Sequence, residues 1–221
     1  MAGKTQLGVF AKFWEPGQVK TRLAQDTNEC FAADIYQAFI QATLESVTGC
    51  ADTQVLAITP PEKLTEFALV IPPDWTLMTQ VDGDLGERMQ AFFQHAVDHR
   101  FEKTVLIGTD SPTLPRTIIQ QAFDILDEVD CVLGPAIDGG YYLVGCKTEI
   151  PPIFEDICWS TEQVLQQTRE ALGEARISYE LLPPWLDVDT IDDLNHLRDS
   201  LQDAGSWLCQ RINDLRLEHL S

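Results

Sequence analysis

Positive charge is scarce in this sequence. Its 221 residues include 15 lysines and arginines against 35 aspartates and glutamates, which gives a formal net charge of −20. A field of this sign repels phosphate backbones and anionic lipid headgroups over a Debye length of roughly 8–10 Å. We therefore expect neither nucleic acid nor a membrane surface as a partner. A small phosphorylated ligand would need local cations, so the few lysines and arginines that gather in one loop are informative.

Long apolar runs and metal-binding cysteine pairs are also absent. No apolar run approaches the ~20 residues that a membrane-spanning helix needs, and residues 1–6 lack an apolar export segment. The six cysteines form no C-x-x-C pair, and no histidine stands at the spacing of a zinc site. We interpret them as buried, small apolar residues, although an even count leaves disulfides open. These features predict a cytoplasmic protein.

Short apolar segments of strand length recur along the chain. They cover residues 7–10, 55–58, 77–81, 105–107, 131–133 and 142–144. Segments with helical periodicity lie between them, and the clearest cover residues 30–47, 87–99 and 117–126. Strands that alternate with helices predict an α/β fold with a largely parallel sheet.

Helix signals also mark the last third of the chain. Ser160 and Gln163 form a capping-box pattern, which predicts that a helix begins at Ser160. Another helical region is expected after Thr190, with one break at Ala204-Gly205. We expect its apolar stripe to pack on the chain itself rather than on a partner subunit; the stripe consists of Leu208, Ile212 and Leu215. Residues 1–221 are predicted to form one domain with a helical extension over about 190–221.

The first predicted strand leads into a loop that is rich in positive charge. Residues 11–23 read AKFWEPGQVKTRL and hold three of the chain's 15 cations, namely Lys12, Lys20 and Arg22. Open parallel sheets bind ligands at the carboxyl ends of their strands. Cations before a helix N-terminus suit a polyphosphate there, although the Walker A pattern is absent. A solvated basic turn is the alternative interpretation.

An aspartate follows the fourth apolar segment. Residues 108–112 read GTDSP, which places Asp110 just after a buried strand. A hard cation at this position can join a carboxylate to phosphate oxygens. The alternative is that Asp110 merely caps the helix region that follows.

A second acidic pair lies near the C-terminus. Asp187 and Asp189 are separated by one residue, so they point the same way if the segment is extended. Either could complete a two-carboxylate metal site with Asp110. An N-cap at Thr190, with Asp193 three residues later, is a simpler explanation for residues 190–194. It does not explain the acidic pair at residues 187 and 189.

Two glycine-containing segments could approach a ligand closely. Residues 81–89 read VDGDLGERM and precede a helix, so their backbone amides could contact a base or a phosphate; a structural turn is the alternative. Residues 133–142 read LGPAIDGGYY and link two predicted strands, where Asp-Gly is also a hairpin signal. The second glycine and the paired tyrosines exceed what a turn requires.

Taken in order, these segments resemble a bacterial family of transferases with a three-layer, Rossmann-like GT-A fold, often labelled glycosyltransferase or nucleotide-diphospho-sugar transferase. The Lys-Thr-Arg-Leu loop is also similar to that of phospholactate guanylyltransferases, and the Asp110 and Asp189 pair is similar to the metal-binding acids of nucleotidyltransferases. One departure is Phe13-Trp14-Glu15, where the family more often has small residues and proline. The matching motifs are AKx4GxxKTRL at 11–23, GDLGERM at 83–89, GTDSP at 108–112, GPxxDGGYYL at 134–143, WST at 159–161 and DVDT at 187–190.

The resemblance implies roles for particular residues. Asp110 and Asp189 would hold Mg²⁺ or Mn²⁺, and Asp110, Lys20 and Arg22 would be the catalytic groups. The nucleotide would contact the basic loop and the first glycine segment, through Lys12, Gly17, Lys20, Arg22, Gly83, Leu85, Gly86 and Arg88. The acceptor would contact the second glycine segment and one aromatic residue, through Asp138, Gly139, Gly140, Tyr141 and Trp159.

Three functions are compatible with this predicted site. The first is Mg²⁺-dependent nucleotidyl transfer from a nucleoside triphosphate to a small phosphorylated acceptor, which we favour because a triphosphate gives Lys20 and Arg22 more charge to hold than a diphosphate ester does. The second is glycosyl transfer from a nucleotide-diphospho-sugar, with Asp138 as the base. The third is an inactive domain that senses a nucleotide. The base, the acceptor and the oligomeric state, for which a homodimer is one option, stay open.

Overall fold

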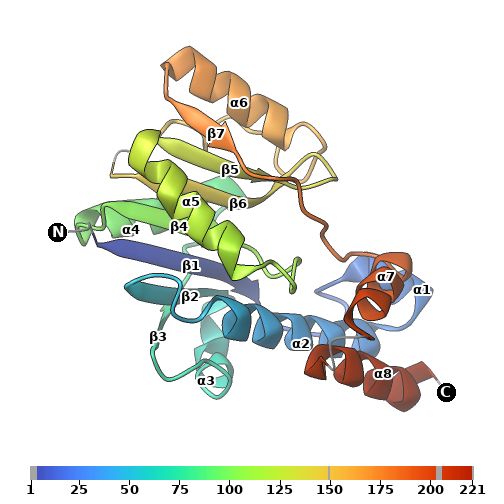
Figure 1. The fold of residues 1–221 in the computed structure, drawn as a ribbon. Coiled ribbons are helices and arrows are strands. Elements are labelled where there is room, and N and C mark those ends of the chain that lie inside the picture. Colours follow the sequence, from blue (N-terminus) through green and yellow to red (C-terminus); the bar gives the residue numbers. More distant parts are fainter. Residues whose placement is uncertain (1–3, 149, 203–205, 221) are drawn as a thin grey trace.

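A seven-stranded sheet forms the centre of the molecule. The computed structural model describes residues 4–148, 150–202 and 206–220. Its sheet has the strand order β3-β2-β1-β4-β6-β5-β7 (Figure 1). The strands are β1 (Thr5–Lys12), β2 (Thr53–Thr59), β3 (Trp75–Thr79), β4 (Lys103–Ile107), β5 (Cys131–Pro135), β6 (Tyr141–Lys147) and β7 (Tyr179–Leu181). The sequence predicted the first six; β7 is only three residues long and largely exposed, so no apolar run marks it.

The sheet is mostly parallel, as predicted. Strands β1 to β4 pair in parallel, β5 pairs with β7 in parallel, and β6 runs antiparallel to both β4 and β5. The Asp138-Gly139 segment therefore does link a hairpin, between β5 and β6. Because β1, β4 and β5 run in the same direction, the segments that follow them meet at one edge of the sheet.

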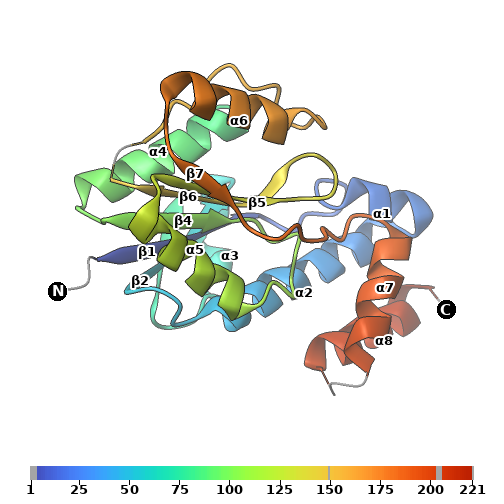
Figure 2. The ribbon, with the colours of Figure 1, turned by 45° about the horizontal axis from the view of Figure 1, so that its top comes forward.

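Helices cover both faces of the sheet (Figure 2). On one face lie α2 (Glu29–Val47), α5 (Arg116–Glu128) and the short α3 (Leu64–Phe67), which follows a 3₁₀ turn at Pro61–Lys63. On the other face lie α4 (Leu85–Asp98) and α6 (Val164–Ala175). Apolar side chains of the central strands point alternately to the two faces and fill both layers. The predicted α/β fold is confirmed.

Three further helices pack on the outer side of α2. They are α1 (Thr21–Asp26), α7 (Ile191–Leu201) and α8 (Trp207–Leu220), and Figure 1 shows α7 and α8 in red beside the blue α2. The stripe of Leu208, Ile212 and Leu215 is buried in this layer, so it packs within the chain as expected. The predicted break at Ala204-Gly205 lies outside the described residues. Within the described ranges, no helix combines the length and apolarity that crossing a bilayer requires.

Two local predictions are wrong. Helix α6 begins at Val164 rather than at Ser160, because Ser160 has a left-handed φ of 63° and the N-cap Gln163 makes no side-chain capping bond. The six cysteines are all free, but Cys30 and Cys158 are exposed rather than buried, since they lie on an outward helix face and in a surface loop, and Cys50 is half-buried. The alternative for Thr190 is correct: it caps α7 in a capping box with Asp193.

Candidate active site

The two acidic segments meet because residues 182–188 run along the carboxyl edge of the sheet. The backbone N–H of Leu182 donates to Leu133 O at 2.9 Å, and that of Trp185 donates to Pro135 O at 3.0 Å. Further along, Val188 N–H donates to Asp110 O at 2.9 Å. Val188 is buried in the core, and its two acidic neighbours line cavities at this edge. The sequence-distant aspartates thereby become neighbours.

Lys20 is the centre of this site. Its side chain is only 3% exposed, and its Nζ contacts Oδ1 of Asp110 and, at 3.0 Å, Oδ1 of Asp189. Its backbone is left-handed, with φ of 45° and ψ of 47°, directly before α1. That conformation costs an L-residue roughly 1–2 kcal/mol. Such strain is most often retained where a side chain must be held in one functional position.

The charge on Lys20 is secured by its partners. Burial lowers the pKa of the Lys20 ammonium, but the nearby carboxylates of Asp110 and Asp189 outweigh this effect and raise the pKa above its ordinary value. An isolated buried ammonium would instead lose its proton. Lys20 is therefore a permanent cation at neutral pH.

The other two cations of the loop share a cavity with Lys20. This cavity has a volume of about 320 Å³, and Lys12, Lys20, Arg22, Asp110 and Asp189 all contribute to its lining. The Arg22 side chain is 68% exposed, and its Nη1 lies 3.5 Å from Asp189 Oδ2. The Lys12 ammonium donates to Gln18 O at 2.8 Å. Exposed cations around a cavity of this size can bind the oxygens of a polyphosphate.

Three other residues of the basic loop also line this cavity, namely Gln18, Val19 and Thr21, whereas Phe13, Trp14 and Gly17 do not. Gly17 lies in the turn between Lys12 and Lys20. Phe13 and Trp14, which depart from the family pattern, stack on each other at 4.6 Å between ring centroids and pack against Phe67 of α3. Their bulk therefore faces the apolar core. Since α1 has only six residues, the charge in this cavity comes from side chains rather than from a helix dipole.

Tyr36 is a site residue that sequence reasoning missed. Its hydroxyl accepts hydrogen bonds from Lys12 N–H at 3.1 Å and from Thr109 Oγ1 at 2.9 Å. It thereby joins the end of β1 to the residue before Asp110. Burial raises the pKa of Tyr36, and the Asp110 carboxylate adds to this effect. In sequence Tyr36 is one more large residue on the buried face of a helix, so no signal distinguishes it.

A larger cavity of about 1190 Å³ continues from the first one. Arg22 and Asp110 line both cavities, which places them at the junction. Tyr141 and Trp159 form part of its wall, with their rings edge to face at 6.4 Å between centroids. All five residues predicted for the acceptor line this cavity, namely Asp138, Gly139, Gly140, Tyr141 and Trp159. Their role in binding stays a prediction.

The first glycine segment lies at the rim of the larger cavity. Leu85 lines it, while Arg88 Nε donates to Gly83 O at 2.9 Å, within the segment. Gly86 packs so closely on Trp159 that a Cβ there would lie 2.6 Å from the indole nitrogen. Gly86 is thus needed for the wall to form. Contact of these residues with a nucleotide stays a prediction.

Asp187 is held beside Asp110 in the larger cavity. Its Oδ1 accepts a hydrogen bond from Ser111 Oγ at 2.5 Å. Burial raises its pKa to about 6; the Ser111 bond opposes this, and the carboxylates of Asp110 and Asp138 add to it. An unfolded aspartate titrates near ~3.9. Because the folded state holds the proton more tightly, Asp187 favours folding below about pH 4 and loses that contribution as the pH rises through about 6.

The substitution Asp187→Asn is therefore expected to raise Tm at about pH 8 and to change it little at about pH 4. The shift in pKa corresponds to at most about 3 kcal/mol, which partial solvation of the site reduces to roughly 1–2 kcal/mol. Thermal unfolding in the presence of a chelator, with the exposed Asp124→Asn as a matched control, measures this difference. A gain in Tm that is equal at both pH values would contradict the shifted pKa.

The carboxylates fit the divalent metal that the sequence predicts. Asp110 and Asp189 direct oxygens at one point, which the Lys20 ammonium also reaches. Among the residues that the structure describes, no group of three His, Cys, Asp or Glu side chains is arranged to hold a metal. Mg²⁺ is usually bound through one or two carboxylates, with water and substrate phosphates completing its coordination. The donor set therefore suits a metal that shares its ligands with a phosphate.

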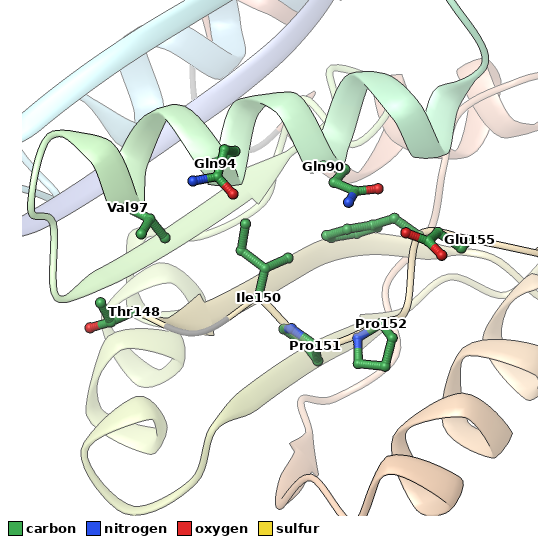
Figure 3. A pocket seen from close by; sticks show the side chains of 9 residues that line it. Gln90, Gln94, Val97, Thr148, Ile150, Pro151, Pro152 and Glu155 are labelled. Atoms are coloured by element: carbon green, nitrogen blue, oxygen red, sulfur yellow. The ribbon is translucent and has the colours of Figure 1, made fainter.

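A third cavity shares no lining residue with the two joined cavities. It has a volume of about 470 Å³ and lies between α4 and the segment of residues 150–155, with Thr148 at its edge (Figure 3). Gln90 and Gln94 line one side, and Pro151 and Pro152 line the other. None of the described lining residues is a lysine or arginine. It is therefore a poorer candidate for a phosphorylated ligand than the two joined cavities.

Comparisons with known proteins agree with this fold. A model of the family "Uncharacterized protein conserved in bacteria (DUF2064)" matches residues 43–161. A solved structure of a proposed nucleotide-diphospho-sugar transferase from Desulfovibrio desulfuricans G20 is 32% identical over 96% of this chain and 95% of that chain, with a TM-score of 0.90. A search of curated proteins gives no match.

Two more distant structures share the fold. A nucleotidyl transferase from Methanothermobacter thermautotroptrophicus is 13% identical over 92% of this chain and all of that chain (100%), with a TM-score of 0.62. Rv0371c from Mycobacterium tuberculosis H37Rv, solved in complex with manganese, is 16% identical over 89% of this chain and 98% of that chain, with a TM-score of 0.50. These matches confirm the predicted resemblance and the fold class of the nucleotide-sugar transferases.

Proposed function

The chain belongs to the bacterial family DUF2064, and we propose that it is a divalent-metal-dependent transferase that takes its donor group from a nucleotide. The likeness to nucleotidyltransferases and to a nucleotide-diphospho-sugar transferase supports a nucleotide-using transferase. The observation that carries the proposal is the Lys20 ammonium between Asp110 and Asp189, in one cavity with Lys12 and Arg22. In a chain of net charge −20, such a cluster of cations supports the binding of phosphates at this position.

Within this class, the proposed reaction is nucleotidyl transfer to a small phosphorylated acceptor. An oxygen of the acceptor phosphate attacks the α-phosphate of a nucleoside triphosphate in line, a new P–O bond forms, and the bond to the leaving pyrophosphate breaks. Lys20 and Arg22 bind phosphate oxygens and stabilise the charge on the reacting group. A Mg²⁺ or Mn²⁺ ion on Asp110 and Asp189 would supply further positive charge against the phosphates.

The two joined cavities divide the substrates between them in this proposal. The 320 Å³ cavity is large enough for phosphates, and the 1190 Å³ cavity receives the acceptor against Tyr141 and Trp159. Arg22, which lines both, is placed to hold a phosphate at the junction. The first glycine segment would hold the base at the rim, through Leu85.

Glycosyl transfer from a nucleotide-diphospho-sugar is the second candidate. The aromatic wall of Tyr141 and Trp159 suits a sugar ring, and the most extensive likeness above is to a proposed transferase of this kind. Asp138 would act as the base here; its side chain is exposed and its Oδ1 accepts from Gly140 N–H at 3.0 Å. We rank this candidate second because three cations exceed what a diphosphate ester needs.

A thermal-shift panel of nucleoside triphosphates and sugar nucleotides, with and without Mg²⁺, separates these candidates. Nucleotidyl transfer predicts a metal-dependent rise in Tm with a triphosphate and release of pyrophosphate when a phosphorylated acceptor is added. Glycosyl transfer predicts the larger rise with a sugar nucleotide. Stabilisation by a nucleotide without product from any acceptor would favour an inactive sensing domain. No shift with either set would refute the proposed class.

A further inference from the structure

The Lys20 ammonium stands where the proposed metal ligands converge. Its Nζ contacts both Asp110 and Asp189, and its side chain is almost fully buried. A metal ion cannot share this point with an ammonium, because two cations a few ångströms apart repel strongly where water is largely excluded. We propose that Lys20 guards the two carboxylates: its ammonium occupies the metal position, so that a divalent metal binds tightly only when a phosphate ligand also binds the ammonium. This rests on the proposed function for the nature of that ligand.

The cavity beside Lys20 gives its ammonium a second set of partners. Lys20 lines the 320 Å³ cavity, where Lys12 and Arg22 would hold phosphates. When metal and phosphate bind together, the metal replaces the ammonium at the carboxylates. The ammonium then contacts phosphate oxygens in place of the carboxylates. Every charge stays paired when both halves happen together. A metal alone would leave a buried ammonium without a partner, which is strongly unfavourable.

Aromatic rings support Lys20 in the guarding position. Its Nζ lies 5.7 Å from the ring centroid of Phe39 and 6.0 Å from that of Tyr36. Asp110 and Asp189 are 51% and 33% exposed, so a solvated ion can reach them from the cavity. A free metal ion can therefore reach the carboxylates from solvent, but it must displace the Lys20 ammonium in order to bind them. Binding of metal and phosphate should then be coupled.

Mn²⁺ titration of the full-length protein without nucleotide tests this inference. We expect Lys20→Met, which keeps the apolar stem and removes the charge, to bind Mn²⁺ ~tenfold or more tightly than the wild type. Lys12→Met is the matched control, since it removes an equal charge from the same cavity but its ammonium donates to Gln18 O rather than to a carboxylate. Lys12→Met should change the Mn²⁺ affinity by less than ~threefold. Equal Mn²⁺ affinity of wild type and Lys20→Met would overturn the proposal, as would equal gains in both variants.

Sodium tripolyphosphate provides a second, base-free measurement. In the wild type, tripolyphosphate and Mn²⁺ should each raise the affinity of the other ~tenfold, and Lys20→Met should lose most of this coupling. If Lys20→Met does not fold, the wild type still decides: Mn²⁺ affinity that is the same with and without tripolyphosphate overturns the proposal. Neither measurement uses turnover. A protein that shows this coupling but transfers neither a nucleotidyl nor a glycosyl group would refute the proposed function and leave the guarding role intact.

Discussion

Replacing Asp110 with asparagine is expected to abolish measurable turnover while the fold stays intact. Asp110 meets Lys20, lines both cavities and carries the charge around which the proposed phosphates and metal are arranged. Loss of one group that stabilises charge in a transition state typically costs ~3–4 kcal/mol, or a factor of about 10²–10³ in rate. The fold tolerates the change because the Asp110 side chain is half exposed and Lys20 keeps Asp189 as a partner.

The measurement compares turnover with stability for the same preparations. Product formation at saturating donor and acceptor gives the rate, and urea unfolding gives the free energy of unfolding. Asp124→Asn is the matched control, because it removes an equal charge from the exposed side of α5, away from both cavities. It should leave rate and stability unchanged. Full metal-dependent activity in Asp110→Asn would show that Asp110 is not a catalytic residue. Equal rate losses in both variants would show that the rate depends on the net charge of the protein rather than on Asp110 itself.

The strands could be predicted because their apolar residues are continuous in sequence. Val105 and Ile107 of β4 are buried on one face, and Leu106 is buried on the other, which is what a run without polar interruptions indicates for a central strand. Asp110 then follows from position alone, since the carboxyl end of such a strand is where an open sheet binds ligands. The short β7 could not be found, because three residues, two of them exposed, leave no hydrophobic pattern.

The arrangement around Lys20 could be predicted only in part. The sequence indicated a cation in the loop after β1 and acids elsewhere, but Lys20 and Asp189 are 169 residues apart and nothing local shows that they touch. Their contact depends on how residues 182–188 follow the sheet edge, which is set by backbone bonds such as that from Val188 to Asp110. The position of the Tyr36 hydroxyl in the site could likewise not be predicted from the sequence. Tertiary packing, rather than any motif, places these groups.

The substitution Gly139→Ala is expected to destabilise the protein and to loosen one wall of the larger cavity. Gly139 has a left-handed φ of 92°, and a Cβ there would lie 2.3 Å from the backbone oxygen of Glu162. Backbone cannot yield as a side chain can, so the β5–β6 connection must move away from the start of α6. The bond from Leu165 N–H to Gly139 O, 2.9 Å long, would be lost or strained. Strain and overpacking of this kind cost together roughly 2–4 kcal/mol.

The neighbouring glycine provides the matched control for this prediction. A Cβ on Gly140 would meet only Asp138 Oδ1, at 3.3 Å, and its φ lies outside the left-handed range. Gly140→Ala should therefore cost less than about 1 kcal/mol. Urea unfolding measures both costs, and hydrogen exchange shows whether residues 136–140 and 161–165 lose protection together in Gly139→Ala. Equal destabilisation by the two substitutions would mean that Gly139 does not pack more closely than Gly140 against the start of α6. Because Asp138, Tyr141 and Trp159 line the cavity that this contact closes, Gly139→Ala should also weaken binding of the acceptor more than Gly140→Ala does.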